Sequence, residues 1–136
     1  MAIVDTGPLY AAADLDDQDH RASVAAMESP GMRLIIPSLV VAETTYLIGR
    51  RLGAQVEAAF LRSLAGLEIE APTPDEWPRI AELVERYGDL PLGGTDASVV
   101  VLAERFGTDL VITLDHRHFG VVRPRHCTAL RLLPER

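Results

Sequence analysis

Four acidic residues stand beside or within strongly apolar stretches of the sequence: Asp5, Glu43, Asp96 and Asp115. Burying an unpaired carboxylate costs several kcal/mol, so each of them needs a partner. The chain contains no Lys, and the only Arg within three positions of any of the four is Arg117. A divalent cation is the simplest partner that all four could share, and carboxylate oxygens suit Mg²⁺ or Mn²⁺.

Each acid also has a purely structural interpretation. Asp5 could cap a following helix, and Asp115 could be a turn residue. Asp96 could favour the positive end of a helix dipole. Glu43 could face solvent on a helix, although its neighbours are apolar. Asp89 could be an ordinary loop residue, or it could support the metal ligands without contacting the metal itself. Four structural explanations at once are harder to accept than any single one.

Apolar runs that alternate with helix-like segments predict an α/β fold, a three-layer α/β/α sandwich around a mainly parallel central sheet. No repeat or linker divides the chain, so we expect a single domain over residues 1–136. The predicted strands are residues 2–5, 34–36, 67–71, 110–114 and 129–133. The predicted helices are residues 6–13, 20–28, 38–52, 55–64, 74–87 and 95–106.

This arrangement predicts where the acids meet. Asp5 and Asp115 end predicted strands, and sites in open parallel sheets form at the carboxyl ends of the strands. Asp96 opens a predicted helix whose first turn points toward the same edge. Glu43 lies further along a helix, and its longer side chain can reach across. We therefore expect the four carboxylates to share one pocket.

Composition limits the setting of this pocket. No apolar stretch approaches the roughly 18 residues of a membrane span, and no basic segment precedes the first strand as it does in a secretory signal. Cys127 is the only cysteine, which fits a reducing compartment. We expect a cytoplasmic location and no membrane partner.

The net charge of −7 at first argues against a nucleic-acid partner, but the charge is unevenly distributed. Between Arg105 and Arg136 the chain holds six Arg and three His against three acids. The segment from Asp14 to Asp19, in contrast, contains four Asp. A bound cation would also neutralise part of the negative total.

Four short motifs occur in a fixed order along the chain: residues 3–6 (IVDT), 37–43 (PSLVVAE), 89–97 (DLPLGGTDA) and 112–115 (ITLD), the last followed by His118-Phe119. Each motif alone is weakly specific, but the four together, at these spacings in a chain of this length, are not. The sequence resembles the PIN-domain family, and in particular the VapC-type toxins of bacterial toxin–antitoxin pairs. The resemblance covers essentially the whole chain.

The resemblance implies a metal-dependent endoribonuclease. It makes Asp5, Glu43, Asp96 and Asp115 the catalytic acids that hold Mg²⁺ or Mn²⁺. Thr6 and Thr113 match hydroxyl positions that support these acids, and Asp89 is a further candidate for support. The implied partners are an RNA substrate, a second copy of the chain in a homodimer, and a VapB-type antitoxin. The tail of that antitoxin would occupy apolar grooves near residues 39–52 and 55–64.

The implied chemistry makes predictions about other residues. Because the metal activates a water, the 2′-hydroxyl of RNA is not needed, and the products carry 5′-phosphate and 3′-hydroxyl ends. The three His near the end of the chain are then not needed as general bases, and we expect structural or surface roles for them: His116, His118 and His126. Contacts with the RNA backbone are possible for three Arg that are equally compatible with a solvated surface: Arg117, Arg123 and Arg125.

Other functions are weighed against this one. A phosphoacceptor receiver or small phosphatase would also place Asp residues at strand ends, but a receiver needs a late Lys and this chain has none. A DNA nuclease of the same fold would need extra helices to clamp its substrate. A housekeeping PIN-domain nuclease remains an alternative. A non-catalytic PIN-like module that binds RNA or protein also remains, although it would be expected to have lost at least one acid.

Overall fold

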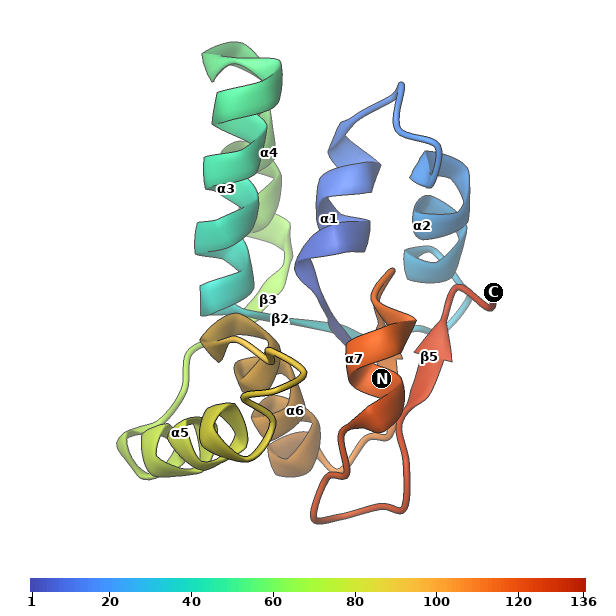
Figure 1. Cartoon of the computed structure of the whole chain (residues 1–136). Helices are drawn as coiled ribbons and strands as arrows, with labels where there is room; N and C mark the ends of the chain where they lie inside the picture. The colour runs from blue at the N-terminus through green and yellow to red at the C-terminus, as the bar shows by residue number, and fades with distance from the viewer.

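The computed structural model describes residues 1–136 as a five-stranded, wholly parallel sheet covered by helices (Figure 1). The elements are β1 (Ala2–Val4), α1 (Thr6–Ala13), α2 (His20–Met27), β2 (Leu34–Pro37), α3 (Ser38–Leu52), α4 (Ala54–Ser63), β3 (Glu68–Glu70), α5 (Trp77–Arg86), α6 (Gly94–Phe106), β4 (Leu110–Ile112), α7 (His116–Val121) and β5 (Arg131–Leu133). Single 3-10 turns cover residues 64–66 and 74–76.

The strand order is β3-β2-β1-β4-β5, so the first strand of the chain lies in the middle of the sheet. Each residue of β1 is fully buried. Ile3 pairs with Ile35 of β2 on one side and with Val111 of β4 on the other. A central strand covered on both faces is expected to be apolar throughout, and the sequences of β1 and β4 are.

Helices cover both faces of the sheet. Figure 1 places α1 to α4 on one side of the strands and α5 with α6 on the other. α6 packs on β1, β2 and β4, and α5 packs on α6. Residues 97–103 of α6 are all buried, because this helix lies between the sheet and α5. Gly107 ends α6 at a φ of 66°, a left-handed conformation that favours glycine.

The α/β prediction is confirmed, with three local corrections. The helix predicted over residues 74–87 is divided into a 3-10 turn and α5. Four strands are shorter than predicted: β1 covers Ala2–Val4 instead of 2–5, β3 covers Glu68–Glu70 instead of 67–71, β4 covers Leu110–Ile112 instead of 110–114, and β5 covers Arg131–Leu133 instead of 129–133. The segment after Asp115, for which no element was predicted, forms α7. None of the helices is both long and apolar enough to cross a membrane.

Candidate metal site at the carboxyl edge of the sheet

The centre of the site is the point where β1 and β4 end side by side. Val4 pairs with Ile112, and the N–H of Asp5 donates to the carbonyl of Ile112 at 2.9 Å. Asp5 therefore lies beside Thr113, whose hydroxyl donates to Asp5 Oδ2 at 2.8 Å. The same hydroxyl accepts a 2.9 Å hydrogen bond from the N–H of Asp115. Thr113 thus joins the two acids that follow the two central strands.

Asp96 and Asp115 approach one another around the ring of His118. Asp96 lies in the first turn of α6, where the N–H of Gly93 donates to its Oδ2 at 3.4 Å. Asp115 caps α7 by accepting a 2.9 Å hydrogen bond from the N–H of His118. The Nδ1 of His118 lies 2.6 Å from Asp115 Oδ2 and 4.0 Å from Asp96 Oδ2, and neither contact is a hydrogen bond.

Glu43 joins this group through its charge and not through a hydrogen bond. It lies on the exposed part of α3, the helix that follows β2. Its negative charge helps to raise the pKa of Asp5 and of Asp96. We call Asp5, Glu43, Asp96 and Asp115 the acidic edge.

Two carboxylates of the acidic edge, those of Asp5 and Asp96, are costly to ionise. Burial raises the pKa of Asp5 to about 7. The Thr113 hydrogen bond opposes this rise, and the charges of Asp96 and Glu43 add to it. Burial also raises the pKa of Asp96, and the charges of Asp115 and Glu43 act in the same direction. Carboxyl groups in such surroundings gain most from a bound positive charge.

The residues fit a hard divalent cation by their chemistry. All four carboxylates supply oxygen, the donor that Mg²⁺ and Mn²⁺ prefer. The hydroxyl of Thr6, directly after Asp5, is buried and has no hydrogen-bond partner. The four side chains nevertheless surround the edge without forming a closed cage, since no three His, Cys, Asp or Glu side chains are gathered closely enough to hold an ion. They would have to move together around it.

A comparison with protein families identifies the domain. The model of the PIN domain matches residues 2–123. The chain belongs to the PIN-domain family. Ribonuclease VapC26 of Mycobacterium tuberculosis is 40% identical to it over 124 residues, which are 90% of this chain and 92% of the relative.

Solved structures share the fold of this PIN domain. VapC20 of Mycobacterium tuberculosis, a toxin that cleaves the sarcin–ricin loop, superposes with a TM-score of 0.76 and 20% identity over 82% of this chain and 87% of its own. VapBC2 of Rickettsia felis, bound to a DNA fragment from its promoter, gives a TM-score of 0.69 and 16% identity over 96% of this chain and 97% of its own. At these identities the likeness shows the fold alone.

The other predicted site residues of the PIN domain differ in whether they are buried beside the acidic edge or exposed away from it. Thr6 and Thr113 are buried beside Asp5. Asp89 is exposed in the turn between α5 and α6 and makes no hydrogen bond to any of the four acids. Arg117 is exposed on α7 and has no ion-pair partner.

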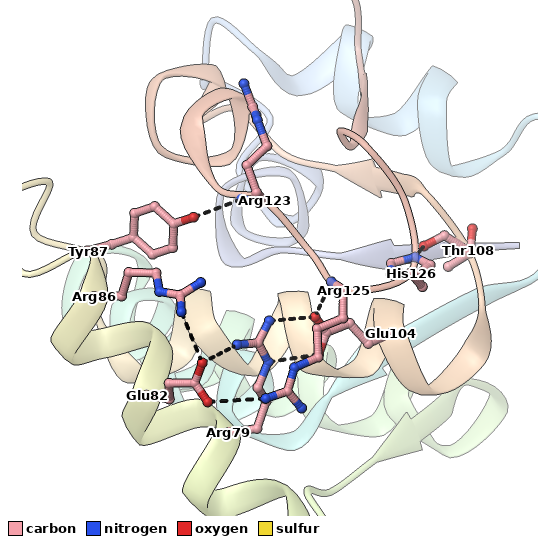
Figure 2. A network of polar contacts seen from close by, with 9 residues as sticks. All are labelled: Arg79, Glu82, Arg86, Tyr87, Glu104, Thr108, Arg123, Arg125 and His126. Atoms are coloured by element: carbon pink, nitrogen blue, oxygen red, sulfur yellow. Dashed lines mark hydrogen bonds and ion pairs between the residues drawn. The ribbon is translucent and has the colours of Figure 1, made fainter.

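Arg123 and Arg125 follow α7 and differ from each other (Figure 2). The guanidinium of Arg123 donates only to the carbonyls of Gly120 and Val122, whereas that of Arg125 pairs with Glu82 at 3.2 Å. Arg123 therefore keeps its charge available to an anion, and Arg125 does not.

His118 is the residue whose place the sequence did not indicate. A structural or surface role was expected for it, yet its ring lies between two acids of the acidic edge. The spacing of three residues from Asp115 is the signal that could have found it, because residues three apart meet on one face of a helix. That signal requires knowledge of α7. Of the other two, His126 contacts the carbonyl of Thr108 at 2.8 Å, and His116 has a buried Nε2 without a partner.

Proposed function

We propose that this protein is a metal-dependent endoribonuclease and the toxin of a VapBC-type toxin–antitoxin pair. The observation that carries this proposal is the 40% identity to Ribonuclease VapC26 over nine-tenths of both chains. The acidic edge supports it, because no Arg pairs with any of the four carboxylates. That is the condition expected of groups reserved for a cation.

Asp5, Glu43, Asp96 and Asp115 would hold Mg²⁺ or Mn²⁺. When bound, such an ion lowers the pKa of water and neutralises the negative charge that builds up on a phosphodiester during attack. Thr113 keeps Asp5 and Asp115 in register through its two hydrogen bonds. Thr6 offers a further hydroxyl, and exposed Asp89 remains a candidate only for an outer supporting role.

RNA would approach from the side of α7. The loop between α1 and α2 holds Asp14, Asp16, Asp17 and Asp19 and would repel a polyanion. Arg117 and Arg123 carry guanidinium groups without a carboxylate partner, so we assign the RNA backbone contacts first to them and last to Arg125. Arg123→Ala should raise KM a few-fold and reduce the salt dependence of binding by about one phosphate contact.

The antitoxin would bind a groove between α1 and α4. This groove has a volume of about 290 Å³ and is lined by Ser63 and by six apolar residues: Leu9, Ala12, Ala13, Val56, Ala59 and Phe60. The residues from α4 lie in one of the two segments expected to bind an antitoxin, residues 55–64. The other expected segment, which is α3, does not line the groove. An amphipathic helix with apolar anchors suits such a groove.

We further propose that the whole chain forms one domain, that it acts in the cytoplasm and that two copies form a homodimer. Light scattering at micromolar concentration without antitoxin tests the dimer, and a monomer would contradict it. Expression of the protein alone should arrest growth, and co-expression of the antitoxin should relieve the arrest. Normal growth with abundant soluble protein would favour a housekeeping nuclease instead.

The nuclease itself is tested with purified protein and total RNA, in Mg²⁺ or Mn²⁺ and in EDTA. We expect cleavage only with metal, and new ends that carry 5′-phosphate and 3′-hydroxyl groups. We expect four variants, Asp5→Asn, Glu43→Gln, Asp96→Asn and Asp115→Asn, each to lower the cleavage rate by more than about 100-fold. Loss of a residue that only supports a metal ligand already lowers metal affinity or activity by roughly 10- to 100-fold. Wild-type rates in two of these four variants would refute the assignment, as would RNA binding without cleavage by the intact protein.

A further inference from the structure

A segment directly after α7 is tied to distant parts of the chain. We call residues 122–126 the strap. The backbone N–H of Arg123 donates to the hydroxyl of Tyr87 at 3.0 Å, and the N–H of Arg125 donates to Glu104 Oε2 at 2.7 Å (Figure 2). Both hydrogen bonds come from backbone N–H groups of the strap, so they fix the position of its backbone and not of its side chains.

Glu104 is itself fixed by a buried Arg. Arg79 donates from Nε to Glu104 Oε1 at 3.1 Å and from Nη2 to Oε2 at 2.8 Å. The Arg79 side chain is only 8% exposed and that of Glu104 13%. Burial acts to raise the pKa of Glu104, but the hydrogen bonds from Arg79 and from the strap hold it below its usual value. Glu104 is therefore an ionised and rigid acceptor at neutral pH.

Tyr87 holds a second segment as well as the strap. Its carbonyl accepts hydrogen bonds from the N–H groups of Leu90 and Leu92, at 3.0 and 3.1 Å. These residues form the turn that leads to Gly93, whose own N–H donates to Asp96. Tyr87 therefore accepts hydrogen bonds both from the turn that precedes α6 and from the strap that follows α7.

α7 connects the strap to the acidic edge. The helix has only six residues, with Asp115 as its cap and the strap at its other end. Phe119 is its only buried residue, and Val122, the first residue of the strap, is also buried in the core. A helix of six residues takes its position from what holds its two ends, and the strap holds one of them.

We propose that Tyr87 and Glu104 are positioning residues of the site: by holding the strap they set the separation of Asp96 and Asp115, and with it the affinity of the acidic edge for Mg²⁺ or Mn²⁺. This inference rests on the proposed metal-dependent function. It adds two residues that lie outside the acidic edge and form no hydrogen bond or ion pair with its four carboxylates.

The test is the stabilisation of the protein by Mn²⁺. Tyr87→Phe removes one hydroxyl and keeps the ring. The rise of melting temperature with Mn²⁺ concentration gives an apparent Kd, since a ligand stabilises the state that it binds. We expect this Kd to increase by roughly 10-fold in Tyr87→Phe, the lower end of the effect of outer-shell partners. The same loss should appear in kcat for RNA cleavage at fixed Mn²⁺, with KM for RNA unchanged.

Three further variants make the result specific. Tyr10→Phe also removes a hydroxyl that makes a 2.8 Å hydrogen bond, to Asp14, and should bind Mn²⁺ like wild type. Arg125→Ala keeps the backbone N–H that binds Glu104 and should also keep wild-type Mn²⁺ affinity. Glu104→Gln should weaken Mn²⁺ binding as Tyr87→Phe does.

The outcomes separate the two proposals. If Tyr87→Phe melts at a lower temperature but responds to Mn²⁺ like wild type, the ties are only structural and the positioning role is wrong, while the nuclease stands. If wild type neither responds to Mn²⁺ nor cleaves RNA, the proposed function fails and the inference fails with it.

Discussion

Two groups of acids in this chain have opposite electrostatic surroundings. At the acidic edge, burial and neighbouring negative charges raise the pKa of Asp5 and Asp96, and His118 is the nearest basic side chain. Around α5 and α6, Arg side chains pair with four carboxylates: Arg79 with Glu82 and Glu104, Arg86 and Arg125 with Glu82, and Arg105 with Glu70 and Glu76. We call this second group the arginine network.

The difference shows which acids serve the fold and which do not. In the arginine network the partner Arg lowers the pKa of Glu76 and Glu104 against the effect of burial, so ionisation and folding support one another. For Asp5 and Asp96 of the acidic edge, ionisation and folding oppose one another. A carboxylate that weakens its own fold when charged is a candidate for function, although structural networks also shift pKa values.

The largest expected effect is the pH dependence of stability at the acidic edge. With a pKa of about 7 in the folded state, Asp5 binds its proton more tightly there than in the unfolded chain, where the value is near 3.8. The unfolded state therefore loses its proton first, and the free energy of unfolding falls as pH rises from about 4 to about 7, by up to roughly 4 kcal/mol.

Urea denaturation in EDTA between pH 4 and 8 measures this effect. Asp5→Asn should lose this dependence and unfold at a higher urea concentration than wild type at pH 8. Asp109→Asn is the control, because Arg131 lowers the pKa of Asp109 and its contribution is lost as pH falls below about 4. A wild-type stability that rises between pH 4 and 7 would contradict the account.

The second prediction concerns a substitution that disrupts the arginine network. Arg79→Leu leaves Glu104 ionised and largely buried without its partner, which should cost about 3 kcal/mol in the free energy of unfolding. The control is Arg131→Leu, which breaks an exposed pair with Asp109 and should cost less than about 1 kcal/mol. Urea denaturation of both variants at pH 7 measures the difference, and equal losses would remove the distinction between buried and exposed pairs.

The third prediction concerns repulsion between the negative charges of the acidic edge. Asp96→Asn removes one of several like charges without changing the shape of the side chain, so in EDTA the variant should melt a few degrees above wild type. Mn²⁺ should raise the melting temperature of wild type more than that of the variant. A role for Asp96 in the helix dipole alone predicts a variant that melts at or below wild type and an equal response to metal.

The smallest expected effect concerns the one basic side chain at the acidic edge. His118→Ala should reduce RNA cleavage by about 10-fold, as expected when a neighbour that orients a ligand is removed. His118→Asn, whose amide nitrogen comes closest to the place of Nδ1, should retain more activity than His118→Gln. A loss of about 1,000-fold, within the range of a general base, would show that His118 takes a proton from the nucleophile.

The sequence predicted the parts of the fold that local patterns encode. Apolar runs marked β1 and β4, and Asp5 and Asp115 could be placed at their ends because parallel strands share a carboxyl edge. The predicted helix over residues 95–106 ends as α6 does, directly before Gly107. Each of these signals lies within a few residues of the feature that it predicts.

What the sequence did not predict depends on contacts between distant segments. α7 is short and contains a Gly, and its one buried side chain, Phe119, becomes informative only when the core is known. The pairing of Arg79 with Glu104 joins residues 25 apart on two helices, so no local pattern reveals it. The raised pKa of Asp5 likewise follows from burial.

The hydrogen bond between Thr113 and Asp5 also limits when the site can form during synthesis. The two residues are 108 positions apart. β1 lies between β2 and β4, so it can pair with its second neighbour only after β4 has been synthesised. Chains emerge from the ribosome N-terminus first, and contacts between distant residues form late. A nascent chain that ends before Thr113 therefore has Asp5, Glu43 and Asp96 but no complete acidic edge. The acidic edge is therefore incomplete until β4 and the start of α7 have left the exit tunnel of the ribosome.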